Sequence, residues 1–200
     1  MTNKELYTAP SWNQIYRLLL KQGAKICRGG FKPDVIVGIS RGGWIPARVL
    51  SDLLGNPNLA NVKAEFYTGI AESRKEPTLT QCLSANVSGK RVLIVDEVAD
   101  SGRSLQLVVA HVLEKGASVV KTATLYRKPQ SAFQPDFYEK QTGCWVVFPW
   151  EIKETVHNIY ESHKTRPEQA EREFTALHTA GVPKLLITRF LNGFSETKKC

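Results

Sequence analysis

The stretch Val92–Leu105 constrains the fold more than any other part of the chain. It begins with four apolar residues, continues with the acidic pair Asp96 and Glu97, and reaches the turn Ser101–Ser104 before an amphipathic helix pattern. A buried strand that runs into a helix is typical of a parallel α/β sheet, which binds ligands at the carboxyl ends of its strands. The free N–H groups at a helix start favour a phosphate, and paired carboxylates suit hydroxyls or a hydrated divalent cation. The sequence therefore predicts a sugar-phosphate site here.

The same residues also fit a simpler structure. An Asp-Glu pair followed by a glycine turn can be an ordinary connection between a strand and a capped helix, and short motifs also arise by chance. The prediction of a site therefore depends on further elements of the same kind elsewhere in the chain.

A second apolar run that ends in a glycine turn lies earlier in the chain. The segment Val35–Ile39 is expected to be a buried strand, and a helix is expected over 45–54. Between them, Gly42 and Gly43 let the backbone approach an anion closely, and the guanidinium of Arg41 suits phosphate oxygens. The alternative is a Gly-rich turn with a solvated arginine, which is common in α/β proteins.

A third group of residues fits a heterocyclic base. Lys128 follows an expected strand over 117–126, and its long side chain carries three donors for an exocyclic carbonyl oxygen. Further along, Trp145 and Val146 offer a flat apolar wall, with backbone groups beside Val147 to read ring edges. The alternative is that this later segment is a core strand, because buried aromatic residues more often serve packing.

Together these elements resemble the type I phosphoribosyltransferases, over about residues 11–151. In that family two acidic residues and a loop of the form D-[ST]-G-x-[ST] hold the ribose 5-phosphate of phosphoribosyl pyrophosphate; here the loop reads Asp-Ser-Gly-Arg-Ser from Asp100. Family members usually carry a second aspartate and threonines, so Glu97 and the two serines are departures that keep the charge and the hydroxyls. The turn Ser-Arg-Gly-Gly has the form seen in bacterial xanthine-guanine phosphoribosyltransferases, and the overall pattern is similar to archaeal and bacterial enzymes for 6-oxopurines.

The resemblance implies a role for each matched residue. Asp100 is the expected partner of purine N7, as general base or hydrogen-bond partner. Asp96 and Glu97 are expected to hold the ribose hydroxyls and the water shell of Mg²⁺, the expected cofactor. The expected contacts are with the phosphoribosyl group and its 5-phosphate (Asp96, Glu97, Ala99, Ser101, Gly102, Arg103, Ser104), with pyrophosphate (Ser40, Arg41, Gly42, Gly43) and with the base (Lys128, Trp145, Val146, Val147).

The implied reaction is Mg²⁺-dependent purine salvage, in which purine N9 displaces pyrophosphate from C1 of the ribose with inversion. A 6-oxopurine is favoured over adenine because Lys128 only donates hydrogen bonds. Bacterial xanthine-guanine enzymes have an acidic residue at the position of Val147 that helps to select the C2 substituent, so the preference among hypoxanthine, guanine and xanthine stays open. Two other functions stay open: a noncatalytic module of this fold that senses a nucleotide or phosphoribosyl pyrophosphate, and a phosphoribosyltransferase for another base.

The expected fold is α/β, the type I phosphoribosyltransferase fold: a central, mostly parallel sheet flanked by helices, with a small hood and a helical C-terminal extension. The other expected elements are strands over 62–67, 91–95 and 144–148 and helices over 11–27, 105–115, 168–180 and 184–191. Residues 68–87 are an unusually long polar segment, which in the family closes over the active site with its flanking strands. We expect a phosphoribosyltransferase domain over residues 1–151 and an extension of unknown role over 152–200.

Composition narrows the class of protein. The 200 residues are 42% hydrophobic and 23% charged, which suits one substantial core and excludes a disordered chain. No apolar run is long enough to span a membrane, residues 1–7 lack the apolar core of a signal peptide, and the 4 cysteines and 4 histidines show no metal-ligand spacing. The net charge of +8 is spread along the chain, which favours a polyanionic substrate over a nucleic acid. We expect a cytoplasmic enzyme that forms a homodimer or a larger homo-oligomer.

Overall fold

The structure is a computed structural model that describes residues 6–69 and 72–196. Residues 16–143 form one compact unit, which we call the sheet unit, and residues 1–15 with 144–200 form a second, the helical unit. Each unit has a hydrophobic core cluster of its own. The packing therefore changes after Gly143. The expected division into a phosphoribosyltransferase domain over 1–151 and an extension over 152–200 stays a prediction.

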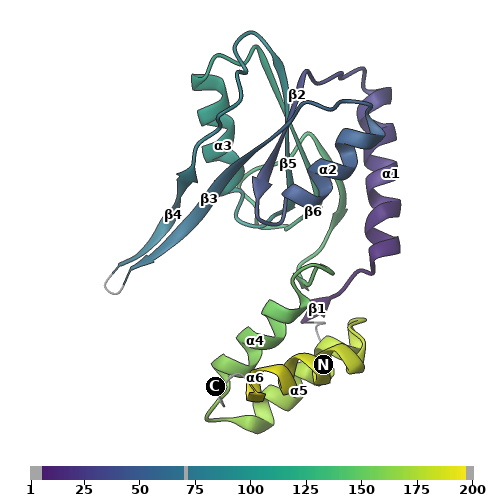
Figure 1. Ribbon diagram of the computed structural model, residues 1–200, viewed down its shortest axis with the longest axis vertical. Coiled ribbons are helices and arrows are strands. Elements are labelled where there is room, and N and C mark those ends of the chain that lie inside the picture. Colours follow the sequence, from purple (N-terminus) through teal and green to yellow (C-terminus); the bar gives the residue numbers. More distant parts are fainter. Residues whose placement is uncertain (1–5, 70–71, 197–200) are drawn as a thin grey trace. The chain divides into compact units, whose positions relative to one another are not determined.

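The sheet unit contains a six-stranded sheet with strand order β4-β3-β2-β5-β6-β7 (Figure 1). The strands are β2 (Val35–Ser40), β3 (Leu59–Gly69), β4 (Glu72–Gln81), β5 (Arg91–Ala99), β6 (Val119–Arg127) and β7 (Phe137–Gln141). All neighbouring strands run parallel except β3 and β4. This confirms the predicted mostly parallel sheet. The central strands are apolar on both faces, as burial on both sides requires.

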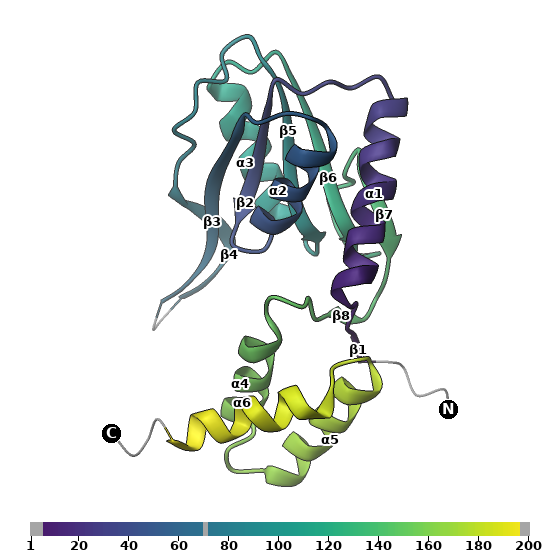
Figure 2. The ribbon, with the colours of Figure 1, turned by 45° about the vertical axis from the view of Figure 1, so that its right-hand side comes forward.

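Helices cover both faces of this sheet. They are α1 (Trp12–Arg28), most of which belongs to the sheet unit, α2 (Trp44–Leu53) and α3 (Arg103–Glu114). Val37 of β2 shares a core cluster with Val108 of α3, whereas a Cβ at the next residue, Gly38, would touch Ala47 of α2. Because successive strand residues point to opposite faces, α2 and α3 lie on opposite sides of the sheet (Figure 2). All three helices lie within two residues of their expected bounds.

The segment expected to be a long polar loop, residues 68–87, is largely a strand. β4 (Glu72–Gln81) pairs antiparallel with β3 and extends it into a hairpin. Its polar composition and Pro77 point away from a strand when the sequence is considered alone, because proline cannot donate to a central ladder. β4 is the edge strand of the sheet, where proline and charged residues are tolerated.

The segment expected as a strand of the main sheet over 144–148 lies elsewhere. β8 (Trp145–Val146) is two residues long and pairs in parallel with β1 (Tyr7–Thr8) in a separate two-stranded sheet. The last strand of the main sheet is β7 (Phe137–Gln141), which the sequence did not predict. β7 lies at the sheet edge and is only partly buried, so it lacks the apolar run that identifies a central strand.

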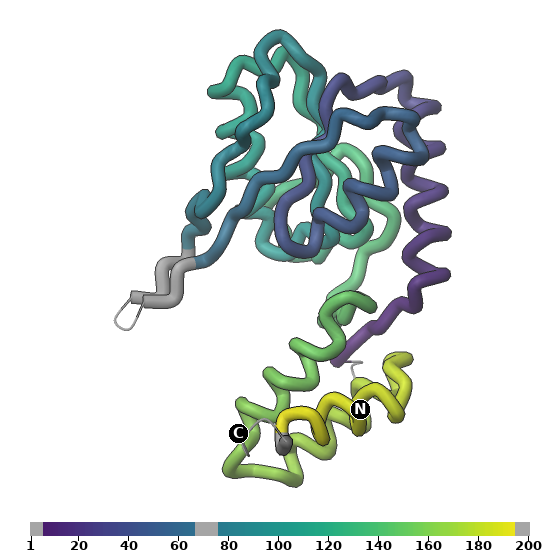
Figure 3. The backbone as a smooth tube through the Cα atoms, in the orientation of Figure 1, coloured from purple at the N-terminus to yellow at the C-terminus, as the bar shows by residue number. Residues whose placement is uncertain are grey.

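Three helices make up most of the helical unit: α4 (Ile152–Ser162), α5 (Pro167–Thr179) and α6 (Lys184–Glu196). The predicted helices over 168–180 and 184–191 are confirmed, and α4 was not predicted. Figure 3 shows α6 beside α4, and Val156, Leu177 and Ile187, one residue from each helix, share a buried cluster with Val147. In the described part of the chain, no helix combines the length and apolarity that crossing a bilayer requires.

Hydrogen bonds tie the segment before α1 into this unit. The hydroxyl of Tyr7 donates to the Glu173 carboxylate of α5 at 2.7 Å, and the same carboxylate lies 3.0 Å from Nε2 of His163. The N–H of Ala9 donates to the carbonyl of Ala180 at 3.2 Å. Residues that are far apart in sequence therefore form one compact body.

Candidate active site

The two glycine turns predicted from the sequence both lie at the carboxyl ends of parallel strands in the main sheet. β2 and β5 are neighbouring parallel strands, and Gly38 near the end of β2 is paired with Val95 of β5. The turn Ser40–Gly43 follows β2, and the acidic pair lies in the last part of β5, just beyond Val95. Ser40 is half-buried, its Oγ accepts a hydrogen bond from the Asn61 side chain at 3.4 Å, and Arg41 is exposed.

The glycines of the first turn are in contact with β5. The space that a Cβ would need at Gly42 is filled by the carboxylate of Glu97. A Cβ at Gly43 would lie 2.6 Å from the carbonyl oxygen of Val95 and 2.7 Å from that of Ile39. The structure therefore brings together the residues expected to hold pyrophosphate and ribose.

The acidic pair is partly removed from water. Asp96 is 9% exposed, Glu97 is half-buried, and one carboxylate oxygen of Asp96 accepts the backbone N–H of Glu97 at 3.0 Å. Burial raises the pKa of Asp96 well above its usual range, and the negative charge of Glu97 raises it further. Oε2 of Glu97 is buried and has no hydrogen-bond partner among the described residues. Ribose hydroxyls or a hydrated cation would satisfy this oxygen and offset the two charges.

The second turn leads into a helix whose N-cap residue, Gly102, makes no side-chain hydrogen bond to the first backbone N–H groups. α3 begins at Arg103, two residues earlier than expected, after Gly102 with φ +81°. Gly102 has no side chain to cap the helix, and the N–H of Arg103 lies 3.4 Å from Oγ of Ser101. Helix N-termini of this kind suit a phosphate group. The guanidinium of Arg103 forms an ion pair with Glu76 of β4 at 3.2 Å, and Ser104 is half-buried in the first turn of α3.

A loop after β6 runs along this second turn. The N–H of Lys128 donates to the carbonyl of Ala99 at 2.9 Å, and the N–H of Ala132 donates to the carbonyl of Ser101 at 3.1 Å. A Cβ at Gly102 would lie 2.7 Å from the backbone nitrogen of Phe133. Lys128, the residue expected to read the base, is 5% exposed and lies beside the expected phosphate loop.

This loop also contains residues that the sequence did not point to. Nε2 of Gln130 donates to the Asp100 carboxylate at 3.3 Å, and Oγ of Ser131 lies 2.8 Å from the place of a Gly102 Cβ. Gln130, Ser131 and Phe133 belong to no motif, and only the pairing of two loops brings them to the site.

The expected base wall belongs to the helical unit. Trp145 is 58% exposed, whereas Val146 and Val147 are buried. The side chain of Val147 packs in the core of the helical unit, and its N–H donates to the carbonyl of Thr8 at 2.8 Å. Of the groups expected to meet a base, the ring of Trp145 is the side chain left open to solvent.

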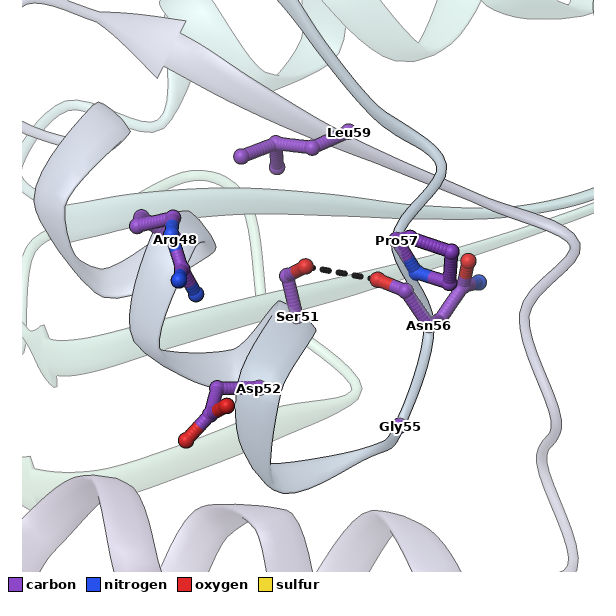
Figure 4. Close-up of a pocket in the computed structure, with 7 residues that line it drawn as sticks. All are labelled: Arg48, Ser51, Asp52, Gly55, Asn56, Pro57 and Leu59. Atoms are coloured by element: carbon purple, nitrogen blue, oxygen red, sulfur yellow. Dashed lines mark hydrogen bonds between the residues drawn. The ribbon is translucent and has the colours of Figure 1, made fainter.

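A cavity of about 460 Å³ lies away from these residues, between the end of α2 and the start of β3 (Figure 4). Its lining includes Arg48, Asp52 and Asn56, and the hydroxyl of Ser51 donates to the Asn56 carbonyl at 2.6 Å. Leu59, which also lines it, is paired with Ile36 near the amino end of β2. The cavity therefore lies at the amino ends of the parallel strands, whereas the two glycine turns lie at their carboxyl ends.

Comparisons with known proteins identify the family of the chain. Residues 4–156 match the phosphoribosyl transferase domain family. Xanthine-guanine phosphoribosyltransferase of Gluconobacter oxydans is 32% identical over 149 residues, which cover 72% of this chain and 84% of that protein. Hypoxanthine-guanine phosphoribosyltransferase of Schizosaccharomyces pombe is 31% identical, with 72% and 88% covered. The crystal structure of a purine phosphoribosyltransferase from Pyrococcus horikoshii superposes with a TM-score of 0.66 at 36% identity, and the match covers 72% of this chain and 93% of that one.

Proposed function

Because the chain belongs to the phosphoribosyl transferase family, we propose that it transfers the 5-phosphoribosyl group of phosphoribosyl pyrophosphate to N9 of a 6-oxopurine, a reaction of purine salvage. The observation that carries this proposal is the contact between the first turn and the acidic pair, because the Glu97 carboxylate lies directly against Gly42. An anion-binding turn beside carboxylates suits a ligand that carries phosphates and hydroxyls together.

Each part of the site has a share in the proposed reaction. The helix start at Ser101–Ser104 holds the 5-phosphate, Ser40–Gly43 holds pyrophosphate, and Asp96 with Glu97 holds the ribose hydroxyls. Purine N9 forms a bond to C1 of the ribose while the bond from C1 to the pyrophosphate oxygen breaks. Asp100 accepts a hydrogen bond or the proton at purine N7 as positive charge builds on the base.

The same carboxylates fit Mg²⁺, on which the family generally depends. The unpartnered, buried Oε2 of Glu97 beside Asp96 is the arrangement of oxygen donors that this cation prefers. When bound, Mg²⁺ supplies positive charge that offsets the charge of the leaving pyrophosphate. The chain itself orients the ribose and keeps the two carboxylates close together.

In the sheet unit, base selection rests on Lys128, whose ammonium group donates to O6 of the purine. Stacking of the base on the exposed ring of Trp145, which belongs to the helical unit, stays a prediction. Val147 supplies no carboxylate for a C2 amino group, so the preferred 6-oxopurine is a matter for measurement. A cytoplasmic location and a homo-oligomeric assembly also stay predictions.

The test is a panel of hypoxanthine, guanine, xanthine, adenine, uracil and orotate with phosphoribosyl pyrophosphate and Mg²⁺. We expect turnover of at least one 6-oxopurine and of none of the last three bases. Lys128→Ala should lose 6-oxopurine activity far more than affinity for phosphoribosyl pyrophosphate, because in the proposed reaction the ammonium group of Lys128 binds the acceptor base. Tight binding of phosphoribosyl pyrophosphate without turnover of any base would support a sensing module instead.

A further inference from the structure

The loop after β6 pairs with the loop that carries Asp100 on both sides of that residue. The N–H of Lys128 donates to the carbonyl of Ala99, just before Asp100, and the N–H of Ala132 donates to the carbonyl of Ser101, just after it. Asp100 is therefore held between two backbone hydrogen bonds from one neighbouring loop.

The middle of that neighbouring loop faces the Asp100 side chain. Nε2 of Gln130 donates to Oδ1 of Asp100 at 3.3 Å. The loop itself is fixed, because the N–H of Ser131 donates to the Lys128 carbonyl at 3.1 Å and the Arg127 guanidinium donates to the Ser131 carbonyl at 3.4 Å. These bonds hold the backbone at Gln130 beside Asp100, and the exposed side chain of Gln130 reaches the carboxylate from there.

We propose that Gln130 is a positioning residue that orients the Asp100 carboxylate toward the acceptor base. This inference rests on the proposed function, in which Asp100 meets purine N7. Asp100 is exposed, and a carboxylate in that setting samples several rotamers unless a second group restricts it. A side-chain amide that donates to one carboxylate oxygen leaves the other oxygen free for the base. Restriction before the base binds lowers the entropy that is lost in reaching the reactive geometry.

The loop after β6 also connects the residue expected to bind the base with the loop expected to bind the 5-phosphate. Gln130 lies two residues after Lys128, and the loop that contains both contacts the phosphate loop at Ala99, Ser101 and Gly102. The group that reads the base and the group that orients Asp100 thus belong to one loop that is hydrogen-bonded to the phosphate loop. A shift of this segment would misalign the acceptor and Asp100 together.

The test compares Gln130→Ala with the wild-type enzyme on its best 6-oxopurine. We expect kcat to fall about tenfold, with the KM for phosphoribosyl pyrophosphate and the unfolding temperature unchanged, because only orientation is lost. Gln130→Glu, which keeps the size and removes the donor, should lose at least as much. The matched control is Gln134→Ala, an exposed glutamine in the same loop, which should leave kcat unchanged.

A double-mutant cycle separates positioning from a merely structural role. If Gln130 acts through Asp100, Gln130→Ala should cause no further loss in the Asp100→Asn background. An equal loss in both backgrounds, or an unchanged kcat for Gln130→Ala, would overturn the inference. A wild-type protein without transferase activity would overturn the proposed function instead, so the two failures are distinguishable.

Discussion

Both glycine turns follow the carboxyl end of a strand, but different kinds of atoms pack against their glycines. Gly42 in the first turn lies against the end of a side chain, the carboxylate of Glu97. Gly102 in the second turn lies against the backbone of Phe133 and against Oγ of Ser131, in a loop that is itself hydrogen-bonded to the turn. The first turn thus packs partly against Glu97, a residue expected to bind the ligand. The second turn packs against a neighbouring loop.

This difference matches what each turn has to do in the proposed reaction. The 5-phosphate stays attached to the ribose in substrate and product, so a rigid cradle serves both states. Pyrophosphate must bind and then leave. The Glu97 carboxylate can turn toward the ribose or the cation, and this allows the first turn to change with its ligand. The second turn packs against a hydrogen-bonded loop and lacks this freedom.

The largest effect is expected from neutralising the acidic pair. Asp96→Asn combined with Glu97→Gln should abolish turnover and the Mg²⁺-dependent part of binding, because the carboxylates no longer hold hydroxyls or the cation. The fold should survive, since burying neutral amides in place of two adjacent carboxylates removes repulsion. Steady-state kinetics with thermal unfolding checks both points, and normal turnover would contradict the assignment of these residues.

The adjacent glycines of the first turn should separate fold from function. Gly43→Ala places a methyl group 2.6 Å from the Val95 carbonyl oxygen, against main chain that cannot move, and should lower the free energy of unfolding by about 3 kcal/mol. For Gly42→Ala the three atoms nearest to the new methyl group belong to the end of the Glu97 side chain, so this variant should fold normally and bind phosphoribosyl pyrophosphate about tenfold more weakly.

The control for Gly42→Ala is a shorter carboxylate. Glu97→Asp in the Gly42→Ala background should restore part of the lost affinity, because the aspartate leaves room for the new methyl group. Chemical denaturation and calorimetric titration measure the two quantities. If Gly42→Ala and Gly43→Ala destabilised the protein equally, the proposed difference between packing against a side chain and packing against the main chain would be wrong.

The smallest effect concerns the anchoring of α3, the helix behind the second turn. Nε2 of His111 accepts the N–H of Leu83 at 3.2 Å, which requires a neutral ring. Burial lowers the pKa of His111, and the charge of Lys115 lowers it further. The unfolded chain then binds the proton more readily, so this stabilisation is present above the ordinary histidine pKa of about 6.5 and is lost as pH falls through the lowered folded pKa.

The measurement is the free energy of unfolding as a function of pH. The wild-type protein should lose a small part of its stability as the pH falls below about 6.5, and His111→Gln, which cannot titrate, should lack that component. The same slope in both proteins would mean that other groups cause it.

The parts of the fold that sequence predicted well are those with local signals. Apolar runs without alternation identified β2 and β5, and glycine turns marked the starts of α2 and α3. β7 and β4 were missed because edge strands carry polar residues, and their pairing comes from the neighbouring strand. β8 was assigned to the wrong sheet because a short apolar run does not say which strand it pairs with.

The residues of the site were likewise predicted only where they belong to a local sequence pattern. Asp96, Asp100 and Gly102 stand out because carboxylates and glycine after a buried strand are a local pattern. Gln130 and Phe133 acquire their places only when two loops pair across the end of the sheet. Val147 shows the reverse case, since its expected position near the base rests on a motif, whereas its side chain packs with the helices of its own unit.

The most direct test of the account is Asp100→Asn, measured for turnover and for binding on the same preparation. Asparagine keeps the shape of the turn and loses the charge that assists at purine N7. We predict that affinity for the product nucleoside monophosphate stays within about tenfold, or about 1.4 kcal/mol, while kcat falls by a factor on the order of a hundred. An unchanged kcat, or parallel losses of kcat and nucleotide affinity, would contradict a transferase site built around Asp100.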